Sequence, residues 1–116
     1  MYAVFIILNN IDKLEDISKV FYDHACGATT IDSEGLGNVL FQNNIDVSIF
    51  AGIRKLVEGN KPYNKTIISI IEGQEKLRTI VDILSKEFID KPGTGVMFVL
   101  PVLECYGIKN DEYINH

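Results

Sequence analysis

Three segments of the chain carry apolar residues at odd and even positions alike, and this pattern constrains the fold more than any other feature. Residues 2–8 carry valine, isoleucine and leucine at one parity and alanine, phenylalanine and isoleucine at the other, and residues 66–71 and 96–102 have a similar pattern. Because successive side chains of a strand point to opposite faces, a sheet with one face in water should alternate apolar and polar residues. The pattern therefore predicts a sheet that is covered on both faces.

Residues with helical spacing follow the first and the second of these apolar segments. The first set recurs every three or four residues and consists of Ile11, Leu14, Ile17, Phe21 and Ala25. The second set has the same spacing and consists of Leu77, Ile80, Val81, Leu84 and Phe88. Either Asn9 or Asn10 is expected to cap the first helix, and Gly27 is expected to end it.

Residues 28–34 form a more polar strand candidate, so the expected order is strand-helix-strand-strand-helix-strand. This order is typical of the α+β, ferredoxin-like fold, in which two helices cover one face of a four-stranded antiparallel sheet. Pro101 has no backbone donor and is expected on an edge strand or at a strand end. A short extended segment is also expected around residues 106–108. Another subunit is the expected cover for the second face, and a closed trimer is the favoured assembly.

A long interval, residues 36–65, separates the two central strand candidates. It is too long for a hairpin loop, and a short helix is expected inside it from the spacing of Ile49, Phe50, Ile53, Leu56 and Val57. The interval is net positive, whereas the whole chain carries a formal charge of −5. Arg54 lies at the edge of the apolar stripe and is its best candidate for binding an anion, because a guanidinium group forms bidentate bonds with phosphate or carboxylate. A solvated helix face with ordinary charges is the alternative.

Composition and charge narrow the function classes. A length of 116 residues predicts one domain over residues 1–116, and the negative net charge argues against a nucleic-acid partner. The apolar run 2–8 is too short for a signal peptide or a membrane span, and two distant cysteines, Cys26 and Cys105, predict no disulfide framework. A cytoplasmic protein is therefore expected. No motif places a histidine beside Ser33 or Ser69, so no enzyme is expected.

Residues 91–95 form a turn in which two glycines flank Thr94 just before the last apolar strand. Glycine tolerates positive φ and allows a ligand to approach closely. A turn of this kind can also point several N–H groups at an anion. Gly93, Thr94 and Gly95 are therefore candidate ligand-binding residues. A tight turn without a ligand is the alternative.

The chain resembles the PII family of trimeric nitrogen-regulatory signalling proteins over nearly its whole length. The run Gly27-Ala28-Thr29-Thr30 with Gly35-Leu36-Gly37 is similar to the entry of the family's T-loop, and Gly93-Thr94-Gly95 with Phe98-Val99-Leu100-Pro101-Val102 is similar to its B-loop and the strand after it. The resemblance implies a signal-transduction homotrimer that binds ATP, ADP or AMP between subunits and docks its T-loop on an enzyme or a membrane transporter. The residues that it places in the ligand site are Thr29, Gly35, Leu36, Gly37, Gly93, Thr94, Gly95 and Lys109.

Several positions depart from the family's pattern. Val96, Gly107 and Val39 stand where the family has a lysine, a basic residue and a glutamine that contact phosphate or metal, and Phe50 lies near the tyrosine that some members modify. Each charge-assisted bond to phosphate is worth about 1.5–3 kcal/mol. The departures therefore predict a divergent PII-like protein whose ligand and target differ from those of the family.

Two other functions fit the same frame. One is a metal-responsive trimer like the divalent-cation tolerance proteins, with His24, Cys26, Asp32 and Glu34 as the candidate ligands. The spacing of His24 and Cys26 matches no closed zinc site, however, so no metal site is expected. The other is a protein-docking module that kept the trimer and lost the ligand.

Overall fold

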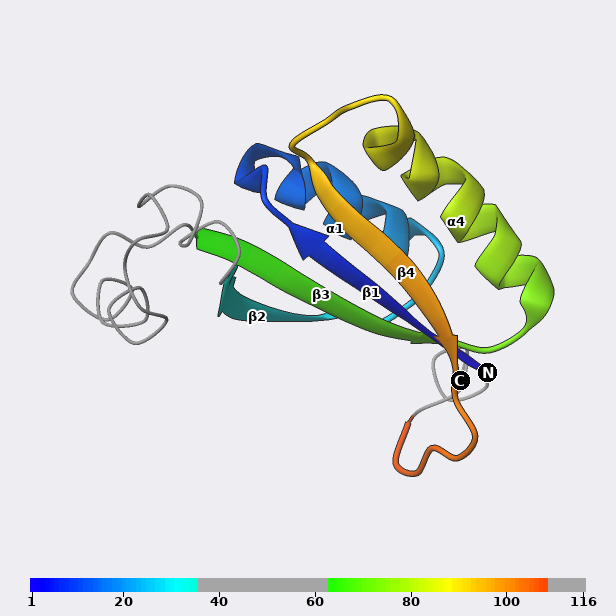
Figure 1. The fold of residues 1–116 in the computed structure, drawn as a ribbon. Helices are drawn as coiled ribbons and strands as arrows, with labels where there is room; N and C mark the ends of the chain where they lie inside the picture. Colours follow the sequence, from blue (N-terminus) through cyan, green and yellow to red (C-terminus); the bar gives the residue numbers. More distant parts are fainter. Residues whose placement is uncertain (36–62, 109–116) are drawn as a thin grey trace.

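The computed structural model describes residues 1–35 and 63–108, which form a four-stranded sheet with two helices on one face (Figure 1). The strands are β1 (Tyr2–Leu8), β2 (Thr29–Glu34), β3 (Tyr63–Ile71) and β4 (Gly95–Pro101). The helices are the short 3-10 helix η1 (Ile11–Lys13), α1 (Leu14–Asp23) and α4 (Gln74–Ile89). The strand order is β2-β3-β1-β4, with every neighbouring pair antiparallel. This arrangement confirms the expected ferredoxin-like α+β fold.

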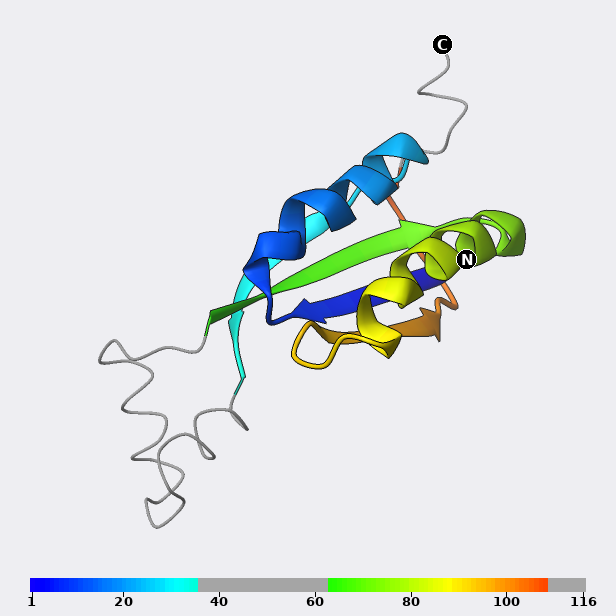
Figure 2. The same cartoon turned by 90° about the horizontal axis from the view of Figure 1, so that it is seen from above.

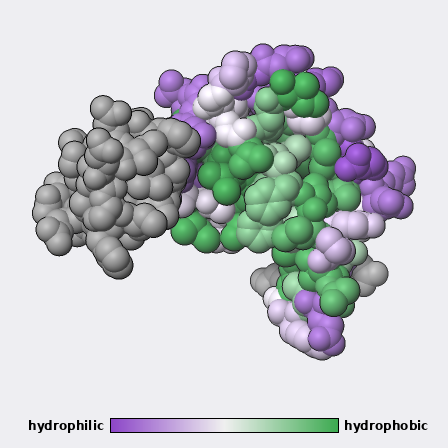
Figure 3. Space-filling view, in the orientation of Figure 1, coloured by the Kyte–Doolittle hydropathy of each residue, from purple (hydrophilic) through white to green (hydrophobic). Residues whose placement is uncertain are grey.

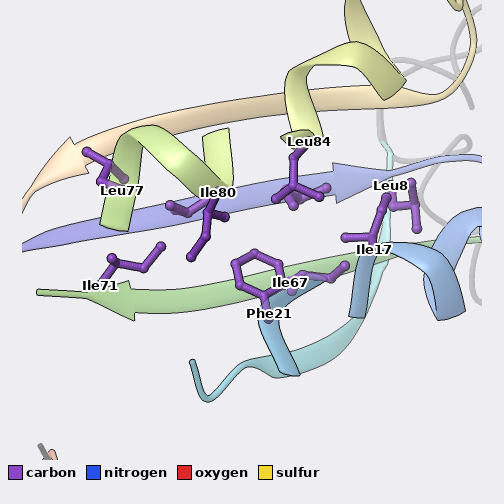
Figure 4. Packing of buried hydrophobic residues seen from close by; sticks show 10 residues of the cluster. Leu8, Ile17, Phe21, Ile67, Ile71, Leu77, Ile80 and Leu84 are labelled. Carbon is purple, nitrogen blue, oxygen red and sulfur yellow. The ribbon is translucent and has the colours of Figure 1, made fainter. Parts of the chain in front are cut away.

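The core lies between the helices and one face of the sheet. Figure 2 shows α1 and α4 side by side over the strands, and Figure 4 shows how their apolar side chains meet those of the sheet. The residues of this core are Val4, Ile6, Leu8, Ile17, Phe21, Ile67, Ile71, Leu77, Ile80 and Leu84. Burial of each large side chain contributes about 1.5–3 kcal/mol, so the packing of these core residues stabilises the helices on the sheet. None of the helices in the described residues is long and apolar enough to span a membrane.

The helical segment after β1 begins as expected but ends two residues before the expected glycine. Of the two candidate caps, Asn10 is the one used, since its side chain accepts a hydrogen bond from the N–H of Asp12 (3.2 Å). At the other end, Ala25 has a φ of 56°, and the N–H of Cys26 donates to the carbonyl of Phe21 (2.8 Å). This is a Schellman ending centred on Ala25, so the prediction that Gly27 ends the helix was wrong.

Two further boundaries differ from those expected. β3 begins at Tyr63, so residues 63–65 belong to the strand and not to the interval 36–65. The strand extends this far because Asn64 and Lys65 pair with Ser33 and Asp32 of β2. The prediction of a short strand around residues 106–108 was wrong, because the described chain after β4 contains none and Gly107 turns it with a φ of 92°. The helix expected within residues 36–65 falls outside the described residues.

The second face of the sheet, here called the open face, is apolar, and no described helix covers it. The strand register places a set of apolar side chains on it, consisting of Ala3, Phe5, Ile7, Ile31, Ile68, Ile70, Val96, Phe98 and Leu100. The last three and Ile31 are 39–50% exposed, and the rings of Phe5 and Phe98 stack with centroids 5.2 Å apart. Figure 3 shows hydrophobic side chains gathered over the strands. The structure thus places apolar side chains on both faces of the sheet. Cover of the open face by another subunit stays a prediction. Pro101 ends an edge strand as expected.

Candidate functional site

The turn before β4 is fastened to the end of β1 by backbone hydrogen bonds. The carbonyl of Thr94 accepts bonds from the N–H groups of Asn9 (2.8 Å) and Asn10 (3.1 Å), and the N–H of Thr94 donates to the carbonyl of Lys91 (3.3 Å). Gly93 and Gly95 have φ values of 88° and 142°, as their sequence context predicted. The Thr94 amide, one of the groups expected to meet an anion, is therefore engaged within the chain.

The two glycines of the turn differ in their surroundings. A Cβ on Gly95 would overlap the carbonyl oxygen of Ile7 and would come within 3.1 Å of the Leu8 Cα. A Cβ on Gly93 would meet nothing within 4 Å. Packing of β4 against β1 thus explains Gly95 without a ligand, whereas Gly93 is exposed and open to an approaching molecule. Thr94 lies between them and is only 4% exposed.

The other candidate ligand residues in the described chain lie at the opposite edge of the sheet. Thr29 begins β2, Gly35 directly follows it, and β2 and β4 are the two edge strands. Three strand spacings separate these edges, which amounts to roughly 14 Å. One copy of the chain therefore does not bring Thr29 and Gly35 next to the turn at residues 93–95. Leu36, Gly37, Arg54 and Lys109 lie outside the described residues.

A row of hydrogen-bonded polar side chains, which the sequence did not predict, crosses the end of the open face near this turn. The Ser33 hydroxyl bonds to the Asn64 side chain and lies 2.8 Å from the Thr66 hydroxyl, and the Asn64 amide donates to Asn9 Oδ1 (3.4 Å). Asn64 is only 4% exposed. Because the Asn9 backbone also holds Thr94, this polar row joins the β2 edge to the turn before β4. In the sequence, this row is indicated by polar residues on the same face of two strands, which are Ser33 in β2 and Asn64 and Thr66 in β3.

A second unpredicted group is a carboxylate shared by two lysines beside the same turn. Lys91 Nζ and Lys13 Nζ lie 3.2 Å and 3.3 Å from the same oxygen, Glu87 Oε2. The hydrogen bond from Lys91, followed by that from Lys13, lowers the pKa of Glu87 below its ordinary value. The sequence signal for half of this group is the i,i+4 spacing of Glu87, in the last turn of α4, and Lys91, two residues beyond the helix.

The candidate metal ligands do not come together. His24 Nδ1 lies 2.7 Å from the carbonyl of Val20, the Cys26 thiol lies 3.6 Å from the carbonyl of His24, and Asp32 forms an ion pair with Lys65. Within residues 1–35 and 63–108, no three side chains of histidine, cysteine, aspartate or glutamate are arranged to hold a metal ion. The metal-responsive alternative therefore has no assembled site among these residues.

Comparison with known proteins identifies the fold. No protein-family model and no curated protein matches the sequence. Among solved structures, the chain is similar to PII of Arabidopsis thaliana bound to citrate, with a TM-score of 0.54 and 19% sequence identity. The match covers 87% of this chain and 76% of that one. At this identity the likeness concerns the fold, so the chain has a PII-like fold, as the resemblance implied.

Proposed function

We propose that the protein is a cytoplasmic, non-catalytic regulator of the PII-like type. A small anion, with ATP, ADP or AMP as the first candidates, binds between copies of the chain and changes how the assembly docks on a target protein such as a membrane transporter. The observation that carries the proposal is the division of the candidate ligand residues between the two edges of one sheet. A site that uses both groups needs a second copy of the chain.

The open face supports the assembly that this site requires. Its large apolar side chains, with the stacked Phe5 and Phe98 at the centre, lie outside the core of one copy. Removing apolar surface from water contributes about 25 cal/mol per Å². A closed homotrimer with the open faces turned inward buries this surface in every copy. It also allows the β4 edge of one copy to lie near the β2 edge of the next.

The ligand is expected to be small and anionic. Gly93 is exposed in a turn with positive φ, and two lysines lie beside that turn. One similar solved structure is a PII protein bound to citrate, which is itself a small anion. Val96 offers no charge at the position where the PII family has a lysine, so we expect phosphate binding to be weaker by about 1.5–3 kcal/mol than in a PII protein with that lysine.

A ligand-free docking module is the second candidate. It is favoured by the turn itself, because packing against Ile7 explains Gly95 and internal hydrogen bonds occupy the backbone of Thr94. In this version the trimer and its target surface remain, and the turn serves only to connect α4 to β4.

A thermal-shift series on protein of measured oligomeric state separates the two candidates. The series contains ATP, ADP, AMP and citrate, each with and without Mg²⁺. A ligand at 100 times its Kd adds about 2.7 kcal/mol of stability per site, which is readily measured. A shift with one of these anions on a trimer supports the regulator. No shift on a trimer supports the docking module, and a monomer at high concentration contradicts both.

A further inference from the structure

We propose that Lys13 and Lys91 are the phosphate-binding cations of this protein and that Glu87 occupies their site when no ligand is present. The inference rests on the proposed function and adds residues that the sequence did not assign to the ligand site. Its ligand class is an anion that carries a phosphoryl group. In this arrangement the carboxylate is an internal substitute for the phosphate, and binding exchanges one anion for the other.

The geometry of the two lysines fits this exchange. Each ammonium group contacts the same carboxylate oxygen, at 3.3 Å for Lys13 and 3.2 Å for Lys91. The two nitrogens are therefore at most about 6.5 Å apart, a span that the oxygens of one phosphate can bridge. The lysines come from separate elements, η1 and the segment after α4, so their convergence is a product of the fold. All three side chains keep 28–48% exposure, which leaves them accessible to a ligand.

The position of Lys91 connects this group to the proposed site. The carbonyl of Lys91 accepts a hydrogen bond from the N–H of Thr94. Lys91 also lies two residues before the exposed Gly93. Lys13 follows Asn10, whose N–H also bonds to Thr94. Both lysines are thus tied through the backbone to the turn at residues 91–95, where Gly93 is exposed.

Nearby negative charge makes displacement of Glu87 necessary. Asp12 and Asp90 are exposed and adjacent in sequence to the two lysines, and the carbonyl end of α4 also disfavours an anion. With Glu87 in place the surroundings are therefore too negative to attract a second anion. With Glu87 displaced, both ammonium groups lose the carboxylate oxygen that they share and can bond to the ligand.

The test measures pyrophosphate and citrate binding by calorimetry in the wild type and in Glu87→Gln, Lys13→Met and Lys91→Met. Breaking an exposed ion pair is inexpensive, so we expect Glu87→Gln to tighten pyrophosphate binding about two- to fivefold. Each lysine variant should weaken it at least about tenfold, because a charge-assisted bond is lost. The matched controls are Lys19→Met and Asp23→Asn, which break another i,i+4 pair of the same length (3.2 Å) on α1 and should change nothing.

The outcomes separate this inference from the proposed function. If ATP binds the wild type and the lysine variants bind pyrophosphate equally well, the inference is wrong and the regulator stands. If Glu87→Gln binds pyrophosphate through both lysines but no nucleotide binds the wild type, the inference stands and the nucleotide regulator does not. If citrate alone gains affinity in Glu87→Gln, the assignment to phosphoryl anions is wrong. If pyrophosphate binds none of the proteins, the inference is also wrong.

Discussion

At the scale of single residues, the two glycines of one turn should respond very differently to the same substitution. Gly95→Ala places a methyl group against the Ile7 carbonyl and keeps an unfavourable φ, so we expect a loss of more than about 3 kcal/mol in the free energy of unfolding. Gly93→Ala meets open space and should cost only the left-handed conformation, about 1–2 kcal/mol. Urea denaturation of both variants measures the difference. Equal losses would mean that β4 does not approach β1 as closely as described.

Glu87 should contribute stability that depends on pH. Its pKa in the folded protein is lowered from the ordinary value of 4.5 by the hydrogen bonds from Lys91 and Lys13. Folding therefore favours the charged form of Glu87. The stability that this charge provides is complete above pH 4.5 and is lost as the pH falls through the lowered pKa. We expect the stability difference between the wild type and Glu87→Gln to be constant from pH 5 to 7 and to shrink below 4.5. Urea denaturation across this pH range, repeated in 1 M NaCl to screen the pairs, measures it. A difference that grows towards low pH would contradict the ion-pair geometry.

At the scale of elements, the polar row should couple β2 to β3 more strongly than the exposed ion pair beside it does. Asn64→Ala removes one hydrogen-bond partner from Ser33 and one from Asn9 at a buried position, so we expect a loss of about 1–3 kcal/mol in unfolding free energy. Asp32→Asn breaks the exposed pair with Lys65 and should cost at most about 1 kcal/mol. Chemical denaturation compares the two. A larger loss in Asp32→Asn would show that the row does not join the strands.

The helices and strands were predictable because they depend on residues that are close in sequence. The residues of the candidate site are distant in sequence, and strand pairing and helix packing bring them together. Spacing of apolar residues is enough to place α1, α4 and the three apolar strands β1, β3 and β4 within a few residues. The helix end at Ala25 was missed because a non-glycine residue takes the left-handed conformation there. The contact of Ser33 with Asn64 spans 31 residues, and its register is set by the pairing of β2 with β3. Likewise, only the packing of η1 near the end of α4 brings Lys13 to Glu87.

At the scale of the whole molecule, the two faces of the sheet separate folding from assembly. Val4 is fully buried against the helices, so Val4→Asp leaves an unpaired charge in the core and should unfold the chain. Phe98 is 39% exposed on the open face, so Phe98→Asp should leave a folded subunit and remove the trimer that we propose. Ile83→Asp is the matched control, because Ile83 is 41% exposed on α4 and lies away from that face. Circular dichroism reports the fold, and light scattering after size exclusion reports the mass. A Phe98→Asp protein that keeps the mass of the wild-type assembly would show that the open face is not the surface through which copies associate, and the intersubunit site would then lose its structural basis.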